Sequence, residues 1–329
     1  MAIKSDLLNA LPAWAKEIPY QIKSIAIKDA CDAVKAAKVK FKRTGKFQQV
    51  SFRSRKNQDY NLFIPKSSVT ENGVYCSLLD ALNLREEVGP AKFDCRVILE
   101  NGRYFLVKPE LRLIQKPDNQ RFPVVALDPG VRTFQTIYTP NGVGKVGQSD
   151  FNKIFRLCYS LDKLSSLRSR NYKSSYTKAS RRIRNKIKDL ISEIHHKLAL
   201  ALVKSFETIL LPSFETSQMV TKLHSKVARS MLTWAHYRFK SFLKCKAEEY
   251  SCNLIEVNEA YTSKTCSACG RISNIGSKKV LKCSCGTVID RDFNGARGIF
   301  LKNLPGVERS FPGLTQGRPQ ESILLNSNV

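Results

Sequence analysis

Two closely spaced cysteine pairs constrain the fold of this chain more than any other feature. Cys266 and Cys269 form a C-x-x-C pair, and after thirteen intervening residues Cys283 and Cys285 form a C-x-C pair. Four thiolates that two tight turns bring together suit tetrahedral Zn²⁺, whereas the alternative, a redox dithiol, needs one pair and not two. The spacing therefore predicts a short insert folded around a structural zinc ion that takes no part in chemistry.

The charge balance points to a polyanionic partner. Among 329 residues, Lys and Arg number 55 against 28 Asp and Glu, a formal net charge of +27. Nucleic acid suits such a surplus best, and a ribosomal-type basic protein or an anionic membrane surface are the alternatives. The longest apolar run, 198–203, is far too short to span a bilayer, and residues 1–20 lack the apolar segment of a secretory signal. We expect an intracellular protein, in the cytoplasm, nucleoid or nucleus, with no membrane partner.

The pattern of apolar residues changes along the chain and predicts several units. Residues 1–40 are rich in helix formers, and residues 41–115 resemble a small, basic, antiparallel β-domain. Within that domain, 95–109 predicts a hairpin around an Asn-Gly turn. From residue 124 the order is strand, strand, helix, strand, helix, strand, cysteine insert and helix, which indicates an α/β layered domain.

A long stretch of the α/β region is strongly basic. Residues 153–188 carry twelve Lys or Arg and one acid, Asp162. Apolar residues recur at helical spacing from Ile183 to Leu202, which predicts a long helix with one side on the core and a basic side exposed. Phosphate contact suits this surface, and a merely solvated basic face is the alternative. The residues that we expect to bind nucleic acid are Arg168, Arg170, Arg181, Arg182, Arg184, Lys186 and Lys188.

Acidic residues next to predicted strands are the candidates for chemistry. Asp128 ends an apolar strand, and Asp290 and Asp292 follow the cysteine insert at the start of the last helix. Carboxylates from separate elements in a basic protein suit a two-Mg²⁺ phosphodiesterase, because two ions about 4 Å apart stabilise the attacking and leaving oxygens. For Asp128, which lies in Asp-Pro-Gly, a simple turn residue is the alternative.

Three stretches resemble the TnpB (OrfB) proteins of insertion sequences and their Fanzor relatives, which are transposon-encoded, RNA-guided DNA nucleases with a split RuvC-like domain. The stretches are VVALDPGVRTFQTIYTP, EAYTSKTCSACG and CGTVIDRDFNGARGIF, and the resemblance runs from about residue 11 to 304. It implies an RNase-H/RuvC-like α/β fold with a zinc finger inserted before its last helix. It also implies a Mg²⁺ site that cuts DNA and a guide RNA made from the transposon end.

The resemblance also assigns parts of the chain. Relative to the family's usual pattern the chain is short at its N-terminus. The implied parts are a helical remnant of the recognition lobe (1–40), a wedge-like β-domain (41–115), a RuvC-like core (120–262), a zinc finger (263–288), the last RuvC-like segment and helix (289–304) and a flexible tail (305–329).

By matching position, the resemblance makes Asp128 the first RuvC carboxylate and Asp292 the third, with the four cysteines as finger ligands. The second carboxylate normally ends the strand TILLPSF, where this chain has Pro212. In rearranged, Fanzor-like members it comes from the strand before the finger, here NLIEVNEAYTS.

That strand offers Glu256 and Glu259, which alternation would place on opposite faces. We choose Glu259 because it is nearer the end of the strand. Glu215 is the other candidate for the second carboxylate. The non-catalytic alternative for Glu259 is a surface acid paired with a lysine.

The resulting hypothesis is a transposon-associated, transposase-type protein that acts as an RNA-guided, Mg²⁺-dependent DNA endonuclease. Its main rival is a truncated, catalytically impaired DNA- or RNA-binding protein of the same family. A zinc-ribbon regulator is a third, weaker alternative, because the α/β pattern is uninterrupted.

Overall fold

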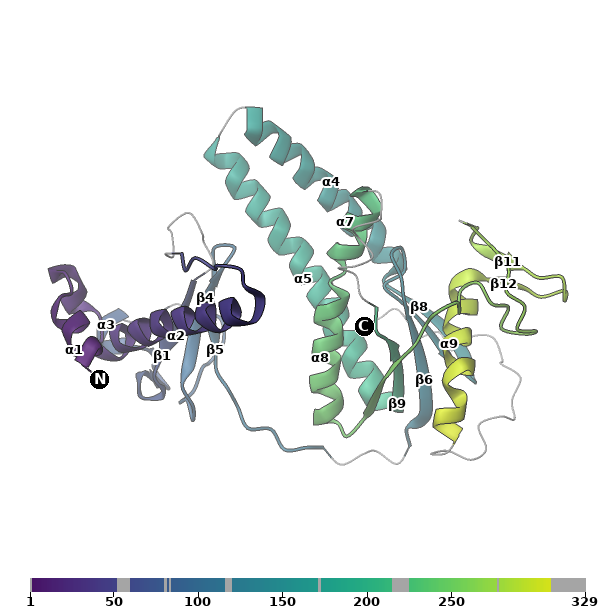
Figure 1. Cartoon of the computed structure of the whole chain (residues 1–329), viewed down its shortest axis with the longest axis horizontal. Helices are drawn as coiled ribbons and strands as arrows, with labels where there is room; N and C mark the ends of the chain where they lie inside the picture. Colours follow the sequence, from purple (N-terminus) through teal and green to yellow (C-terminus); the bar gives the residue numbers. More distant parts are fainter. Residues whose placement is uncertain are drawn as a thin grey trace. The chain divides into compact units, whose positions relative to one another are not determined.

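The computed structural model describes residues 2–51, 60–79, 82, 84–115, 120–170, 173–214, 225–276 and 278–308. The chain divides into two compact units, Met1–Leu111 and Arg112–Val329 (Figure 1). Within the described residues, no helix combines the length and the apolarity that crossing a bilayer would require.

The first unit combines helices with a small antiparallel sheet. Its core consists of Ile64, Val69, Val74 and Cys95. The sheet has the order β1-β4-β5. The elements are α1 (Ala2–Asn9), the 3-10 helix η1 (Ala13–Glu17), α2 (Tyr20–Thr44), β1 (Tyr60–Ile64), the 3-10 helix η2 (Lys66–Ser68), β2 (Val69–Thr70), β3 (Gly73–Val74), α3 (Cys76–Leu79), β4 (Cys95–Glu100) and β5 (Arg103–Val107).

The predicted hairpin in this unit is confirmed. Strands β4 and β5 pair antiparallel, and the pair Glu100–Arg103 closes a two-residue turn. The turn residues Asn101 and Gly102 have φ of 48° and 76°. Positive φ at both central positions is the conformation that Asn-Gly favours and that matches the twist of the two strands.

The second unit is built on a five-stranded mixed sheet. The strand order is β10-β9-β6-β7-β8. Strands β7 and β8 run antiparallel to their neighbours, whereas β9 is parallel to β6 and β10 is parallel to β9. The strands are β6 (Phe122–Pro129), β7 (Gln135–Thr139), β8 (Gly142–Val146), β9 (Phe206–Pro212) and β10 (Asn253–Val257).

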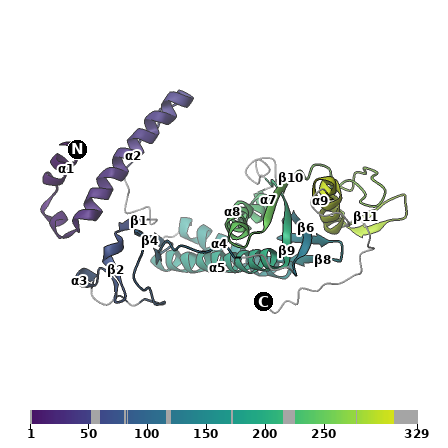
Figure 2. The same ribbon diagram turned by 90° about the horizontal axis from the view of Figure 1, so that it is seen from below.

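Helices cover both faces of this sheet (Figure 2). One face packs on α5 and α8 through residues such as Leu127, Ile209 and Leu211. The other face packs on α9 through Ala126, Leu210 and their neighbours. The helices are α4 (Gln148–Arg170), α5 (Ser174–Ser205), α7 (Ser225–Thr233), α8 (His236–Glu249) and α9 (Arg291–Glu308), and a short ribbon of β11 (Val280–Lys282) and β12 (Val288–Asp290) precedes α9.

Three features of this unit differ from the sequence-based expectation. Strand β8 follows β7 at the edge of the sheet, although its sequence GVGKV has two glycines and weak strand character. The predicted long helix is confirmed as α5, but the basic stretch also contains a second helix, α4, which lies beside α5 (Figure 1). Helix α9 also continues through Pro305 to Glu308, and the remainder of the expected tail lies outside the described residues.

Candidate functional site

A pocket of about 690 Å³ lies where several elements of the second unit end. Its acidic lining consists of Asp128 from the end of β6, Glu259 from the segment after β10, Asp290 from the end of β12 and Asp292 from the first turn of α9. We call it the carboxylate pocket. The structure therefore brings the three sequence-predicted carboxylates, Asp128, Glu259 and Asp292, to one cavity.

Strand alternation and helix packing explain how Asp128 reaches α9. Side chains along β6 alternate between the faces, so Asp128 shares the α9 face with Val124 and Ala126. A Cβ added at Gly295 of α9 would overlap Oδ2 of Asp128. Because Asp292 lies three residues before Gly295, the two positions are neighbours on one side of the helix. The first and third predicted carboxylates are thus adjacent in space.

The structure separates Glu256 from Glu259. Strand β10 ends at Val257, so the prediction that Glu259 belongs to this strand is wrong, and alternation does not set its direction. Glu256 lies within β10 and accepts a hydrogen bond from Nζ of Lys240, on α8, at 2.6 Å. Glu259 instead begins a turn in which the amide and hydroxyl of Thr262 donate to its carbonyl at 3.1 and 2.8 Å. The turn carries Glu259 into the carboxylate pocket.

The position where the resemblance implied a second acid carries no carboxylate. Pro212 is the last residue of β9, is buried, and pairs with Val257 of β10. Its side chain has no ligand atom for a cation. Glu215, the competing candidate, lies outside the described residues.

Burial in the carboxylate pocket disfavours the charged forms of its acids. Burial raises the pKa of Asp128 to about 8, the charges of Glu259 and Asp292 add to the effect, and Arg291 opposes it. Burial also raises the pKa of Glu259. Three clustered acids that repel one another are an environment in which a divalent cation is stabilising.

The acids fit magnesium by the chemistry of their donor atoms. Carboxylate oxygens are the ligands that Mg²⁺ prefers. Among the described residues, the four finger cysteines are the one group of three or more candidate ligands whose atoms all lie within 4.8 Å of one another. The three carboxylates line the same pocket at wider spacing.

Lys145 is a pocket residue that the sequence analysis did not identify. It lies on β8, and its Nζ is 2.9 Å from Oδ2 of Asp290 and 3.4 Å from Oδ2 of Asp292. The ammonium group also lies 4.7 Å from the ring centre of Phe293. In the sequence, Lys145 is a single lysine in a glycine-rich segment, and such a segment predicts neither a strand nor a functional site. Lys145 fixes the direction of the two acids at the entry to α9.

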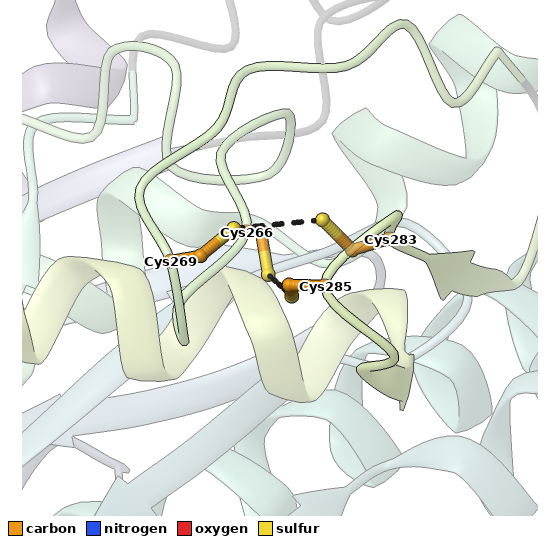
Figure 3. Close-up of side chains that lie close together, drawn as sticks. All are labelled: Cys266, Cys269, Cys283 and Cys285. Atoms are coloured by element: carbon orange, nitrogen blue, oxygen red, sulfur yellow. Dashed lines mark hydrogen bonds between the residues drawn. The ribbon is translucent and has the colours of Figure 1, made fainter.

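The four cysteines converge into one cluster (Figure 3). The Sγ atoms of Cys266 and Cys285 are 3.8 Å apart, and those of Cys269 and Cys283 are 3.5 Å apart. A tetrahedral Zn²⁺ with bonds to sulfur of about 2.3 Å requires sulfur separations of about 3.8 Å. The donor set and its spacing therefore fit a zinc ion with all four positions filled by protein.

Two glycine turns shape this cluster. The amide of Cys266 donates to the carbonyl of Arg271 at 2.9 Å, and the turn closes at Gly270 with φ of 74°. The amide of Cys283 donates to the carbonyl of Thr287 at 2.9 Å, around Gly286 with φ of 90°. Positive φ favours glycine at both turns. The shorter C-x-C pair is accommodated by this second turn.

The finger is tied to α9 by a residue that sequence reasoning missed, Asn294. Its side chain is fully buried. Its Oδ1 accepts from the amide of Ser267 at 2.9 Å, and its Nδ2 donates to the carbonyls of Thr265 and Thr262 at 2.8 and 3.4 Å. One amide two residues after Asp292 thus holds the segment that enters the finger. Asn294 lies in the stretch CGTVIDRDFNGARGIF, but nothing in that stretch assigned it a role.

The predicted phosphate-binding residues lie apart from the lining of the carboxylate pocket. Arg168 and Arg170 are exposed in the last turn of α4, and the other five lie in the first half of α5. Of those five, Arg182, Arg184 and Lys186 are exposed, whereas Arg181 and Lys188 are partly buried. The cationic residues that line the pocket are Arg132, Lys145, Lys278, Lys279 and Arg291.

Comparisons with known proteins agree with this arrangement. The family model described as "Cas12f1-like, TNB domain" matches residues 236–299, which include α8, β10, the finger and the start of α9. A protein of Streptomyces pristinaespiralis named "Putative RNA-guided DNA endonuclease" is 29% identical over 139 residues, 41% of this chain and 34% of that protein.

Viral relatives match over longer regions. A putative transposase of Acanthamoeba polyphaga mimivirus is 36% identical over 215 residues, which are 62% of this chain but less than half, 44%, of that relative. A TnpB-like protein of the same virus is 32% identical over 195 residues, 54% of this chain and 37% of that relative. A putative transposase of Paramecium bursaria Chlorella virus 1 is 30% identical over 307 residues, 88% of this chain and 70% of that relative. With the cysteine cluster and the acids around it, these similarities show that the chain belongs to the TnpB (OrfB) family.

Proposed function

We propose that this protein is an RNA-guided, Mg²⁺-dependent DNA endonuclease whose RuvC-like site consists of Asp128, Glu259 and Asp292. One observation carries the proposal: these three acids, from three separate elements, line one pocket. The mixed sheet with helices on both faces, with Asp128 at the carboxyl end of β6, supports the RuvC-like assignment.

The pocket residues suit phosphodiester hydrolysis. Mg²⁺ held by Asp128, Glu259 and Asp292 would supply positive charge for the phosphate and an activated water. Lys145 holds Asp290 and Asp292 in place before substrate enters. Arg132 and Arg291 also line the pocket and provide charge for the flanking phosphates of a strand.

Target choice by a guide RNA from the transposon end is part of the proposal. The name of the Streptomyces relative supports RNA guidance, and the net charge of +27 suits the phosphate backbones of RNA and DNA. Exposed cations on α4 and α5, such as Arg170 and Arg182, are the proposed backbone contacts. The protein would then act inside the cell, together with its guide and its DNA target, and zinc would hold the finger in shape.

The test begins with purification of the full chain together with its co-expressed RNA. That RNA is sequenced, and DNA matched to it is incubated with and without Mg²⁺. We expect cleavage only with Mg²⁺, and we expect Asp128→Ala to reduce the rate by at least about a thousandfold while RNA binding is retained. Glu193→Gln, at an exposed acid paired with Lys197 on α5, is the matched control and should cleave normally.

A second candidate function is nucleic-acid binding without cleavage. Pro212 at the usual position of an acid favours it. Tight RNA and DNA binding with no cleavage under any Mg²⁺ concentration would establish this alternative. Equal cleavage by the wild type and by Asp128→Ala would refute the site assignment.

A further inference from the structure

A second cavity, of about 480 Å³, lies beside the carboxylate pocket. It is lined from the ends of β6, β7 and β9, from the first turn of α8 and from Glu256 of β10, and we call it the α8 pocket. The two cavities share Pro129 and Phe214 in their linings. The two cavities are therefore adjacent at these two residues.

Two buried polar side chains in the lining of the α8 pocket lack hydrogen-bond partners. His236 is 5% exposed and Gln135 is 1% exposed. Among the described residues, the two ring nitrogens of His236 have no hydrogen-bond partner, and neither has the Oε1 of Gln135. Leaving such groups unsatisfied is destabilising, because they lose their hydration without gaining a partner. Both residues line a cavity, so a ligand can supply the missing partners.

The unsatisfied groups define the chemistry of that ligand. Burial lowers the pKa of His236 to about 4, and the backbone of Gly130 partly offsets this without completing a hydrogen bond. A neutral imidazole offers one donor and one acceptor, and the Oε1 of Gln135 offers an acceptor. The ligand must therefore present both donors and acceptors. A phosphate, which at neutral pH presents mainly acceptors, does not meet this requirement.

The rest of the lining suits a flat aromatic ring. Phe214 and Phe239 line the cavity, and the ring of Phe214 meets His236 edge-on with centroids 4.8 Å apart. The one cation and the one acid of the lining, Lys240 and Glu256, are paired with each other at 2.6 Å. A cavity with aromatic walls, a balanced charge and unmet donors and acceptors matches a nucleobase.

We propose that the α8 pocket binds one base of the nucleic-acid strand whose phosphate lies in the carboxylate pocket. This inference rests on the proposed function, because it takes the strand to enter the carboxylate pocket. The base is unstacked from its neighbours and inserts past Phe214. His236 and Gln135 read its hydrogen-bonding edge, and Phe239 contributes to the wall against which it packs. The pocket then sets the register of the strand at the site and its preference for particular bases.

The test measures binding by the full chain without added Mg²⁺, so it does not depend on cleavage. The probes are two single-stranded hexameric deoxyribonucleotides with a fluorescent end label. One carries a single base flanked by abasic positions, and the other is abasic throughout. We expect the wild type to bind the first at least about fivefold more tightly than the second, with a ratio that differs among the four bases.

Variants locate the effect. His236→Phe and Gln135→Met keep the size of each side chain and remove its polar atoms, and each should bring the ratio close to one. His196→Phe is the matched control, because His196 is exposed and stacks on Phe242 outside both cavities. It should keep the wild-type ratio. Thermal unfolding of each variant checks that the fold is retained.

The outcomes separate this inference from the proposed nuclease. A wild-type ratio of one, or an unchanged ratio in both pocket variants, would overturn the base pocket even if the protein cleaves DNA. Binding of free deoxynucleosides that depends on His236, without any gain from the base in the hexamer, would overturn the assignment to a strand. Asp128→Ala should keep the wild-type ratio of the two hexamer affinities. Loss of cleavage in this variant therefore does not contradict the base pocket.

Discussion

At the scale of single residues, Asn294 links the finger to the carboxylate pocket. Replacing it by Ala leaves the partly buried amide of Ser267 and carbonyl of Thr265 without their partner. We expect Asn294→Ala to lower the free energy of unfolding by about 3 kcal/mol, measured by denaturant unfolding. Asn303→Ala, on the same helix with one hydrogen bond to the carbonyl of Ile299, should cost less than about 1 kcal/mol. Equal costs would mean that the Asn294 network contributes nothing specific.

Another buried residue, His195, makes stability depend on pH. Burial lowers its pKa from 6.5 to about 4, and its Nε2 donates to the carbonyl of Trp234 at 2.9 Å. The folded state keeps this ring neutral, whereas the unfolded chain takes up a proton below about pH 6.5. Stability should therefore be lost as pH falls from about 6.5 to about 4, by up to about 3 kcal/mol.

The measurement compares unfolding free energies at pH 7 and pH 4.5. His195→Gln should lose less stability over this interval than the wild type, because it has no group to titrate. His196→Gln removes an exposed ring and should behave more like the wild type. If His195→Gln loses as much unfolding free energy over this interval as the wild type, the acid sensitivity comes from other groups, such as the finger thiolates.

At the scale of elements, we expect the fold of the finger to depend on a bound metal. The ribbon of β11 and β12 has three residue pairs and cannot supply a core of its own. We expect Cys285→Ser to reduce bound zinc from about one ion per chain to a small fraction, measured by elemental analysis. Proteases should then cut within 263–290. Cys31→Ser, at an exposed thiol on α2, should keep both the zinc and the resistance. A finger that stays protected without zinc would refute a metal-dependent fold.

Some elements follow from local sequence and others do not. The β4–β5 hairpin was predictable, because an Asn-Gly turn and its flanking alternation determine pairing within one short segment. Strand β8 was not, because its glycines have weak strand preference and pairing with β7 supplies the missing stability. The exposed basic residues on α4 and α5 were identified by charge, but their division between two helices was missed.

At the scale of the whole molecule, the two units have separate cores and one tryptophan each. Trp14 lies in the first unit and is 70% exposed, whereas Trp234 is 1% exposed in the core of the second. In Trp14→Phe, fluorescence reports only the second unit. We expect the denaturant midpoint of this fluorescence signal to differ from the midpoint of the far-ultraviolet circular dichroism signal, which reports helices in both units. Coincident midpoints would show that the chain unfolds as one cooperative unit.

The sequence by itself determined the features that depend on spacing along the chain. The Cys266–Cys285 pattern predicts a four-sulfur cluster, and Asp128 and Asp292 mark the ends of elements, because turns and element ends are local properties. Only the tertiary structure decided that Glu259 lines the pocket while Glu256 pairs with Lys240, and that Lys145 and Asn294 join the site. These residues lie on separate strands, turns and helices. Long-range packing of a folded sheet decides which of them meet, and no local periodicity encodes that.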